Sequence, residues 1–317
     1  MKIVLTESLN VPKEKINQLA QPLIDAGHEF TYYPQASPKS SELVRRCNKA
    51  DIIMLANTPF PVEALDQLEQ VKYINIAFTG VDHVPVAEAK ERGIQVSNAS
   101  GYSTTAVAEL VLGLALNLYR QLKQSDIDAR KTADFPGLIT GSEIKGKTLA
   151  IIGTGKIGCE TARLFKALGA DLIAYSRSEN PDFIKLGGRY TSLDEALKLA
   201  DIISLHLPYS EDTHHIIGED QLALLKDSAI LINCARAGVV DTNALCQALT
   251  FGKLAGAAVD VFDSEAPLRE DHPLLTCQNI LLTPHIGYLT HEAMVHRAEI
   301  AFDNTHKFLQ GKAQNLV

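Results

Sequence analysis

Short apolar runs alternate with amphipathic stretches along the chain, which is the pattern of strands and helices in alternation. Helical stretches begin near Pro12, Ser40 and Pro61, as expected from residues that favour helix starts. In the first part of the chain, the apolar runs predict strands at 2–6, 30–33, 51–55, 73–77 and 95–97. Strands that alternate with helices predict a parallel sheet covered on both faces. No glycine fingerprint follows these strands, so this part is expected to have no dinucleotide site of its own.

The second half continues the alternation and contains a glycine-rich turn. Strands are predicted at 148–152, 171–175, 202–205, 229–232, 255–259 and 280–282, as a six-stranded Rossmann sheet requires. The first of them runs into Gly153-x-Gly155-x-x-Gly158, which a helical pattern follows. Gly153 makes the tight turn, Gly155 lets a pyrophosphate approach, and Gly158 lets the helix pack on the strand. Free N–H groups at the helix start hold the phosphate charge, so this context predicts dinucleotide binding.

Two further helical patterns organise the domains. The stretch 106–122 is apolar on nearly every side and is expected to be buried between domains or subunits, whereas 123–147 reads as a looser polar segment. Residues 290–310 are helical again and could return to pack on the first domain. The predicted fold is therefore α/β with two doubly wound parallel sheets. Residues 1–99 plus 289–317 would form a substrate domain, and 100–288 an inserted dinucleotide-binding Rossmann domain.

Composition narrows the classes of function. The chain has 317 residues, 46% of them hydrophobic, and a net charge of −8 without a long basic run, which argues against nucleic acid as a partner. No early apolar segment is long enough for a signal peptide or membrane span. No histidine forms a metal-spaced cluster with carboxylates, so no metal is expected. The scattered cysteines lack a CxxC pair and are expected to be reduced thiols of a cytoplasmic protein: Cys47, Cys159, Cys234, Cys246 and Cys277.

The end of the second Rossmann strand bears on the choice of cofactor. An acidic residue usually stands there and binds the ribose 2′-hydroxyl of NAD. Here the strand is followed by Ser176 and Arg177, and the first carboxylate is Glu179. Arg177 could face the 2′-phosphate of NADP, although a solvated surface arginine would read the same way. NADP is therefore favoured as cofactor, with NAD possible.

Three polar residues follow successive strands of the nucleotide-binding half. Arg236 follows the strand at 229–232, Glu265 the strand at 255–259, and His285 the strand at 280–282. All three would emerge at the carboxyl edge of the sheet, where the nicotinamide end of a dinucleotide lies. Hydride transfer to a carbonyl needs a proton donor, a cation for a substrate carboxylate and a group that tunes the donor. Taken together in this topology, the three residues predict that chemistry.

The loop after the strand at 73–77 is a second candidate site. Gly80 lets the backbone approach a small ligand, and the neighbouring N–H groups suit a carboxylate, although a plain turn glycine is an equal alternative.

Six of these stretches together resemble the D-isomer-specific 2-hydroxyacid dehydrogenase family over essentially the whole chain: 98–109, 153–158, 200–208, 233–241, 256–265 and 283–287. The stretch 101–109 is similar to the hydroxypyruvate and glyoxylate reductase branch. The resemblance implies that a Rossmann domain is inserted in a flavodoxin-like substrate domain. It also implies a dimer built on the cofactor domain and NAD(P)-dependent conversion of a small 2-keto acid to the D-2-hydroxy acid.

The resemblance also implies roles for residues. His285 would be the general acid in reduction, Glu265 would fix its tautomer and raise its pKa, and Arg236 would bind the keto acid. Thr79, Gly80 and Tyr102 would bind substrate from the other domain. Asp260 would bond the nicotinamide carboxamide. The residues implied to contact the cofactor are Thr104, Gly153, Gly155, Lys156, Ile157, Gly158, Ser176, Arg177, His206, Pro208, Thr213, Cys234, Ala235, Arg236, Asp260, His285 and Gly287.

Two departures from the family pattern and several alternatives remain. Ala237 follows Arg236, where glycine is common in the family. Ala266 separates Glu265 from Pro267, whereas the family often has glutamate followed directly by proline. Hydroxypyruvate or glyoxylate is favoured as substrate; pyruvate or a branched keto acid with NAD is the alternative. Phosphoglycerate ranks low because the Gly80 loop offers only His83 as a cation. A non-catalytic dinucleotide sensor is a different class, against which the set of Arg236, Glu265 and His285 argues.

Overall fold

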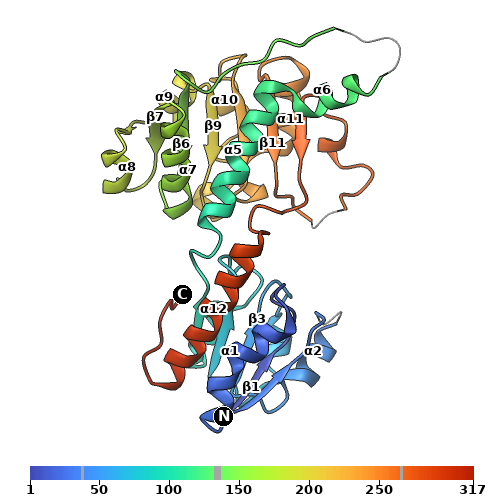
Figure 1. Cartoon of the computed structure of the whole chain (residues 1–317), viewed down its shortest axis with the longest axis vertical. Coiled ribbons are helices and arrows are strands. Elements are labelled where there is room, and N and C mark those ends of the chain that lie inside the picture. The colour runs from blue at the N-terminus through green and yellow to red at the C-terminus, as the bar shows by residue number, and fades with distance from the viewer. Residues whose placement is uncertain (37–38, 132–136, 265–266) are drawn as a thin grey trace. The chain divides into compact units, whose positions relative to one another are not determined.

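The computed structural model describes residues 1–36, 39–131, 137–264 and 267–317, which divide into two compact units (Figure 1). Unit 1 comprises Met1–Ser103 and Leu289–Val317, and unit 2 comprises Thr104–Tyr288. The first boundary thus follows Ser103, whereas the sequence analysis placed it after residue 99. Each unit is a parallel α/β sheet with its own helices, as the alternation of apolar and amphipathic stretches predicted.

Unit 1 contains a five-stranded sheet in the order β2-β1-β3-β4-β5, with every neighbouring pair parallel. This is the flavodoxin-like order. Its elements are β1 (Lys2–Leu5), α1 (Lys13–Asp25), β2 (Glu29–Tyr32), α2 (Ser40–Cys47), β3 (Ile52–Leu55), α3 (Val62–Leu65), β4 (Tyr73–Ile76), α4 (Val86–Glu91), β5 (Gln95–Asn98) and α12 (His291–Leu309).

The alternation of side chains along its strands gives unit 1 two cores. Ile3 and Leu5 of β1 face the core that α1 and α12 cover, whereas Val4 faces the core that α2, α3 and α4 cover. Side chains of a strand point to opposite faces in turn, so an apolar run with no polar alternation fills both cores. The C-terminal helix predicted at 290–310 is α12, and it packs beside α1 on this sheet.

Unit 2 contains a seven-stranded parallel sheet in the order β12-β11-β10-β9-β6-β7-β8. The central place of β6 between β7 and β9 is the topological switch point of a Rossmann sheet. Its elements are α5 (Thr104–Arg120), α6 (Leu122–Ala129), β6 (Thr148–Ile152), α7 (Lys156–Ala167), β7 (Asp171–Tyr175), α8 (Pro181–Lys185), β8 (Arg189–Tyr190), α9 (Leu193–Leu199), β9 (Ile202–Leu205), η1 (Glu211–Thr213), α10 (Glu219–Leu222), β10 (Ile230–Asn233), η2 (Ala237–Val239), α11 (Thr242–Thr250), β11 (Gly256–Val259), η3 (Pro273–Leu275) and β12 (Ile280–Leu282).

Two elements of unit 2 differ from the prediction. A short helix, α6, occupies the start of the segment 123–147, which was expected to be loose and polar. The two-residue strand β8 adds a seventh strand at the edge beside β7. Both are short, and neither carries an apolar periodicity long enough to be read from sequence. Across the described part of the chain, no helix has the length and apolar character needed to cross a membrane.

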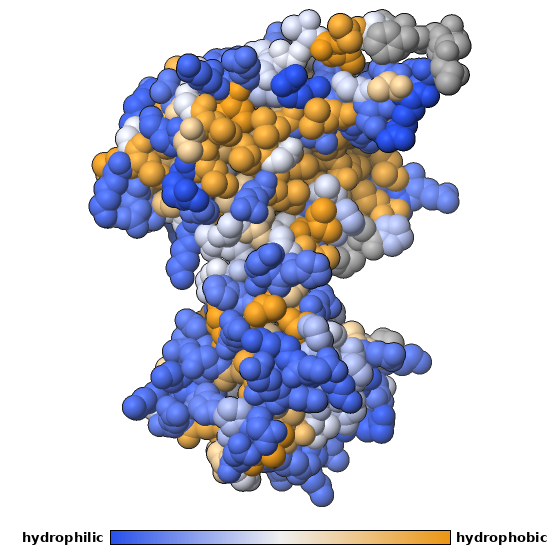
Figure 2. All heavy atoms as spheres, in the orientation of Figure 1, coloured by the Kyte–Doolittle hydropathy of each residue, from blue (hydrophilic) through white to orange (hydrophobic). Residues whose placement is uncertain are grey.

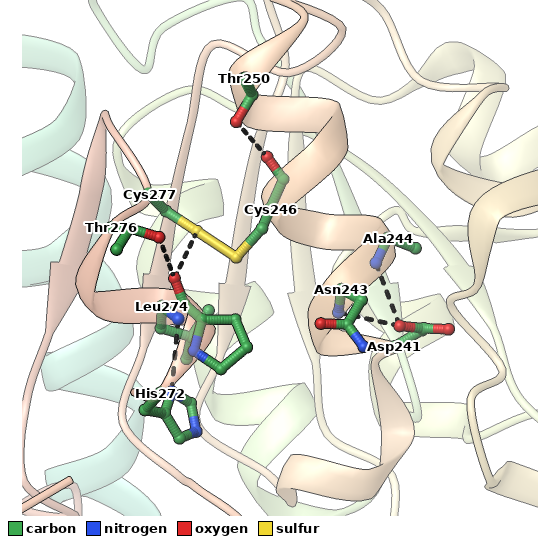
Figure 3. The surroundings of a disulfide bond; sticks show 10 residues. Asp241, Asn243, Ala244, Cys246, Thr250, His272, Leu274, Thr276 and Cys277 are labelled. Atoms are coloured by element: carbon green, nitrogen blue, oxygen red, sulfur yellow. Dashed lines mark hydrogen bonds between the residues drawn. A yellow bond between two sulfur atoms is a disulfide. The ribbon is translucent and has the colours of Figure 1, made fainter. Parts of the chain in front are cut away.

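The structure corrects one prediction about cysteines. Cys246 of α11 and Cys277, which follows η3, form a disulfide with a Cα–Cα distance of 5.6 Å (Figure 3). The prediction of unpaired thiols was therefore wrong for these two, whereas Cys47, Cys159 and Cys234 are free. The partners are 31 residues apart in sequence, and folding of η3 against α11 brings them together. A cytoplasmic location, which the unpaired thiols supported, stays a prediction.

Reduction of this disulfide is expected to destabilise the protein. Cross-linking a loop of this length removes chain entropy worth about 3–4 kcal/mol from the unfolded state. Chemical denaturation with and without dithiothreitol measures the difference in free energy of unfolding. A Cys246→Ser, Cys277→Ser double variant is the matched control, because its stability should not respond to the reductant. Identical unfolding curves of the wild type in both conditions would contradict the expectation.

Candidate active site

The glycine turn after β6 has the geometry that dinucleotide binding needs. Gly153 has φ +101°, and a Cβ there would lie 2.8 Å from the His206 carbonyl oxygen. At Gly158, a Cβ would collide with the Gly153 carbonyl oxygen, so only glycine lets α7 approach β6 this closely. Apart from the adjoining residues of the chain, no described residue lies within 4 Å of a Cβ built on Gly155, which is the N-cap of α7. A phosphate therefore has open access to the N–H groups of the first helical turn, formed by Lys156 and Ile157.

A hydrogen-bond network that the sequence did not predict holds the glycine turn. Tyr190 of β8 donates its hydroxyl to Thr154 Oγ1 at 2.8 Å, and Asn180 Nδ2 donates to the Thr154 carbonyl at 2.9 Å. The Asn180 N–H in turn donates to the Tyr190 hydroxyl at 2.7 Å, while Asn180 also caps α8. Asn180 thereby ties the loop after β7 to the turn. That loop contains Ser176, which is half-buried, and Arg177, which is exposed.

His206 follows β9 and lies against the glycine turn. Its Nε2 pairs with Ser204 Oγ at 2.9 Å, and burial lowers the pKa of His206 to about 4. His206 is therefore neutral at pH 7 and is a poor proton donor there. The loop that follows is closed on itself, because Thr213 Oγ1 donates to the Pro208 carbonyl at 2.7 Å and accepts from the Ser210 N–H.

Arg236 lies in a loop shaped by Asn233, the last residue of β10. The buried Asn233 side chain accepts from the Ala235 N–H at 3.0 Å and donates to the Arg236 carbonyl at 2.9 Å. Burial and the charge of Asp260 raise the pKa of the Cys234 thiol well above its usual value, so this thiol stays protonated. The amide of Asn233 fixes the backbone at Arg236. Sequence analysis assigned no role to Asn233, because local hydrogen bonds of this kind produce no periodic pattern in the sequence.

Asp260, at the end of β11, holds the turn that contains His285. Asp260 is buried, with 1% of the residue exposed. Oδ1 accepts from Thr283 Oγ1 at 2.6 Å and from the Ile286 N–H at 2.9 Å, and Oδ2 accepts from the Gly287 N–H at 2.8 Å. A Cβ at Gly287 would lie 2.9 Å from Oδ2, so glycine keeps this contact short. A carboxylate has about four acceptor sites, so Asp260 could also accept from the nicotinamide carboxamide. That contact stays a prediction.

His285 adopts a backbone conformation that is uncommon for a residue with a side chain. Its φ is +55°, and its N–H donates to the Thr283 carbonyl at 2.9 Å. Such strain persists only where the surroundings enforce it, and here the bonds to Asp260 do so. The imidazole packs edge-on against the ring of Tyr288, with the ring centres 5.3 Å apart. The turn therefore presents a single histidine side chain in a fixed direction.

Glu265, the predicted partner of His285, lies outside the described residues. The segment before it is anchored. His272 Nε2 lies 3.2 Å from Asp263 Oδ1, and His272 Nδ1 accepts from the Leu274 N–H at 3.3 Å. Because Nδ1 accepts, the proton of a neutral His272 is on Nε2 and is donated to Asp263. This histidine therefore has a structural role.

The predicted substrate residues of unit 1 gather at the carboxyl edge of its own sheet. The Thr79 carbonyl accepts from Asn98 Nδ2 at 2.8 Å, and the Phe78 carbonyl accepts from the Ala99 N–H at 2.9 Å. The ring of Tyr102, which is 4% exposed, lies 6.0 Å from that of Phe78. Gly80 follows directly in the same loop.

Within each unit, the predicted residues lie at the carboxyl ends of the strands, where parallel sheets bind ligands. In unit 2, the glycine turn, His206, Arg236, Asp260 and His285 all follow the carboxyl ends of strands. Thr104 is the first residue of α5. Among the residues that the structure describes, no group of three or more His, Cys, Asp or Glu side chains could hold a metal ion.

Comparison with known proteins gives consistent matches. The family model described as D-isomer specific 2-hydroxyacid dehydrogenase, NAD binding domain, matches residues 112–287. A glyoxylate reductase of Thermofilum pendens is 36% identical over 95% of this chain and 90% of its own length. A hydroxypyruvate reductase of Blautia hydrogenotrophica is 32% identical over 87% of each chain. An acyclic imino acid reductase solved with NADPH and D-Arg superposes with a TM-score of 0.88 and 28% identity, over 100% of both chains.

Proposed function

The chain belongs to the D-isomer specific 2-hydroxyacid dehydrogenase family and is an NAD(P)-dependent oxidoreductase, and we propose that it reduces glyoxylate or hydroxypyruvate to the D-2-hydroxy acid. The observation that supports this most is the carboxyl edge of the unit 2 sheet. There, an open phosphate cradle at Gly155 shares one edge with the rigid turn of His285 and the loop of Arg236. Both named reductases are matched over most of their length.

The residues of this chain divide the chemistry between them. The nicotinamide, when bound, supplies the hydride. Arg236 binds the carboxylate and carbonyl oxygens of the keto acid through its planar guanidinium, which suits two parallel hydrogen bonds. His285 donates a proton to the carbonyl oxygen as charge develops there, and Glu265 is the predicted hydrogen-bond partner that orients the imidazole. Backbone amides near Thr79 and Gly80 bind the carboxylate.

A panel of keto acids tests the substrate. Steady-state oxidation of NADPH and NADH with glyoxylate, hydroxypyruvate, pyruvate and phenylpyruvate gives kcat/KM for each pair. The proposal predicts the highest kcat/KM for glyoxylate or hydroxypyruvate. A higher value for phenylpyruvate or pyruvate would refute the substrate assignment, and turnover of none of them would support the sensor instead.

We further propose that NADPH is preferred over NADH. Arg177 follows β7, at the place where an acidic residue usually stands and would repel a 2′-phosphate. Arg177→Ala is expected to raise KM for NADPH about tenfold and to leave KM for NADH unchanged, since one exposed charge-assisted hydrogen bond contributes on the order of 1.4 kcal/mol. Arg163→Ala, which removes an exposed arginine on α7, is the matched control. Higher kcat/KM with NADH than with NADPH in the wild type would contradict the preference.

A homodimer is proposed from the apolar surface of unit 2. Figure 2 shows apolar residues gathered over the face covered by α5 and α7, where Leu116 is 38% and Leu168 is 43% exposed. Patches of this kind mark protein interfaces. Sedimentation velocity is expected to give a dimer, which Leu116→Glu should weaken. Gln247→Glu, on the exposed side of α11, should leave it intact; a wild-type monomer at micromolar concentration would contradict the proposal.

A further inference from the structure

One buried charge has no part in the mechanism above. Arg297 lies on α12 of unit 1, is 1% exposed, and is the largest of the fully buried residues in the described part of the chain. Removing a guanidinium from water is costly, so a buried arginine is retained where its contacts repay the cost. Its surroundings therefore indicate what it does.

The guanidinium of Arg297 lies over one ring of an aromatic pair. Its Cζ lies 5.9 Å from the ring centre of Tyr102, within the range of a cation–π interaction. The Tyr102 ring lies against Phe78, 6.0 Å between centres. Phe78 is the residue before Thr79 and Gly80, whose amides are proposed to hold the substrate carboxylate. A continuous series of contacts thus leads from α12 to the substrate loop.

A second contact from the same helix supports this direction. Asn304 Nδ2 donates to the Asn98 carbonyl at 2.9 Å, while Asn98 Nδ2 donates to the Thr79 carbonyl at 2.8 Å. The Ala99 N–H donates to the Phe78 carbonyl at 2.9 Å. Helix α12 therefore holds the turn 98–102 at two points, and that turn holds the loop 78–80.

We propose that Arg297 is a positioning residue for substrate recognition, acting through Tyr102. This assignment rests on the proposed function, because the ligand in question is the carboxylate of a small 2-keto acid. With Tyr102 fixed, the amides of the loop keep the geometry that a carboxylate needs, and the two rings keep a rigid wall that disfavours large side chains on the substrate. Without the cation, the rings gain freedom, so carboxylate binding weakens and size selection relaxes.

The test separates substrate binding from the cofactor and from stability. Arg297→Met keeps the length of the side chain and removes its charge. It is expected to raise KM for hydroxypyruvate about ten- to thirtyfold, as loss of a desolvated cation–π contact implies. The preference for hydroxypyruvate over phenylpyruvate in kcat/KM should fall, while Kd for NADPH, measured by fluorescence, should not change. Lys15→Met is the matched control, because it removes the Lys15–Glu299 ion pair that also holds α12.

A double-mutant cycle decides whether the effect passes through Tyr102. In a Tyr102→Leu background, Arg297→Met should change KM no further. If Arg297→Met does not fold, Arg297→Lys replaces it throughout, since an ammonium does not stack as a planar guanidinium does, and a severalfold rise in KM is again expected.

Unchanged KM and substrate preference in the variant would overturn the proposal. The proposal would also be overturned if activity fell while substrate preference stayed unchanged and the effects of the two substitutions were additive. That result would show a purely structural role for Arg297. Failure of the proposed function is distinguishable, because then the wild type itself would turn over none of the keto acids.

Discussion

His285→Ala is expected to lower kcat about 10²–10⁴-fold, the usual contribution of a positioned general acid. The hydride can still be delivered, but the alkoxide that develops on the carbonyl oxygen has no proton donor. Kd for NADPH should stay within about twofold of the wild type, because the phosphate cradle at Gly155 is untouched. His206, which follows β9 at the same sheet edge, cannot substitute, since its pKa of about 4 leaves it neutral at pH 7.

Single-turnover kinetics measure this effect on the chemical step, with cofactor binding titrated separately. His28→Ala, in unit 1, is the control for the loss of a histidine and should keep wild-type kcat. A His285→Ala enzyme with more than a tenth of the wild-type kcat would show that another group donates the proton.

Asp260→Asn is expected to lower kcat about 10²-fold although the side chain keeps its shape. The carboxylate accepts from Thr283, Ile286 and Gly287, and an amide has only one oxygen with which to replace two. Its NH₂ group must then face at least one of these donors. A lost bond to a buried charged group costs about 1.5–3 kcal/mol. The turn would shift, and misplacement of about 1 Å at a reacting group costs on the order of 10²-fold in rate.

Asp263→Asn provides the matched control in the same loop. Its carboxylate is 77% exposed and meets only His272 among the contacts described for it, and an amide oxygen can accept that bond as well. Comparing kcat and the denaturation midpoint of both variants distinguishes positioning of His285 from general damage to the loop. Equal, small effects in the two variants would contradict the role assigned to Asp260.

The fold was largely predictable because strand periodicity and burial are local signals. In β1, Val4 faces one core and Ile3 and Leu5 the other, so the apolar run itself indicates a strand covered on both faces. The glycine turn was predictable for the same reason, since a positive φ at Gly153 and contact at Gly158 restrict those positions to glycine. Strand β8 has two residues and depends on pairing with β7, which no local pattern reveals.

The parts of the site that sequence missed depend on contacts between distant residues. Asn233, Asn180 and Tyr190 act through hydrogen bonds to loop backbone or to Thr154, and their residue types have many other uses. The Cys246–Cys277 bond joins two elements whose proximity follows only from the packed sheet. Family resemblance named Asp260 as a cofactor contact, but its three bonds to the His285 turn required coordinates.

The configuration and rate of product formation test the central claim most directly. Wild-type enzyme with hydroxypyruvate and NADPH should form glycerate that is D by chiral chromatography, with one cofactor oxidised per product. His285→Ala should form the same enantiomer at a rate lower by about 10²–10⁴-fold. Formation of L-glycerate, or no oxidation of either NADPH or NADH by the wild type with any small 2-keto acid, would contradict the account.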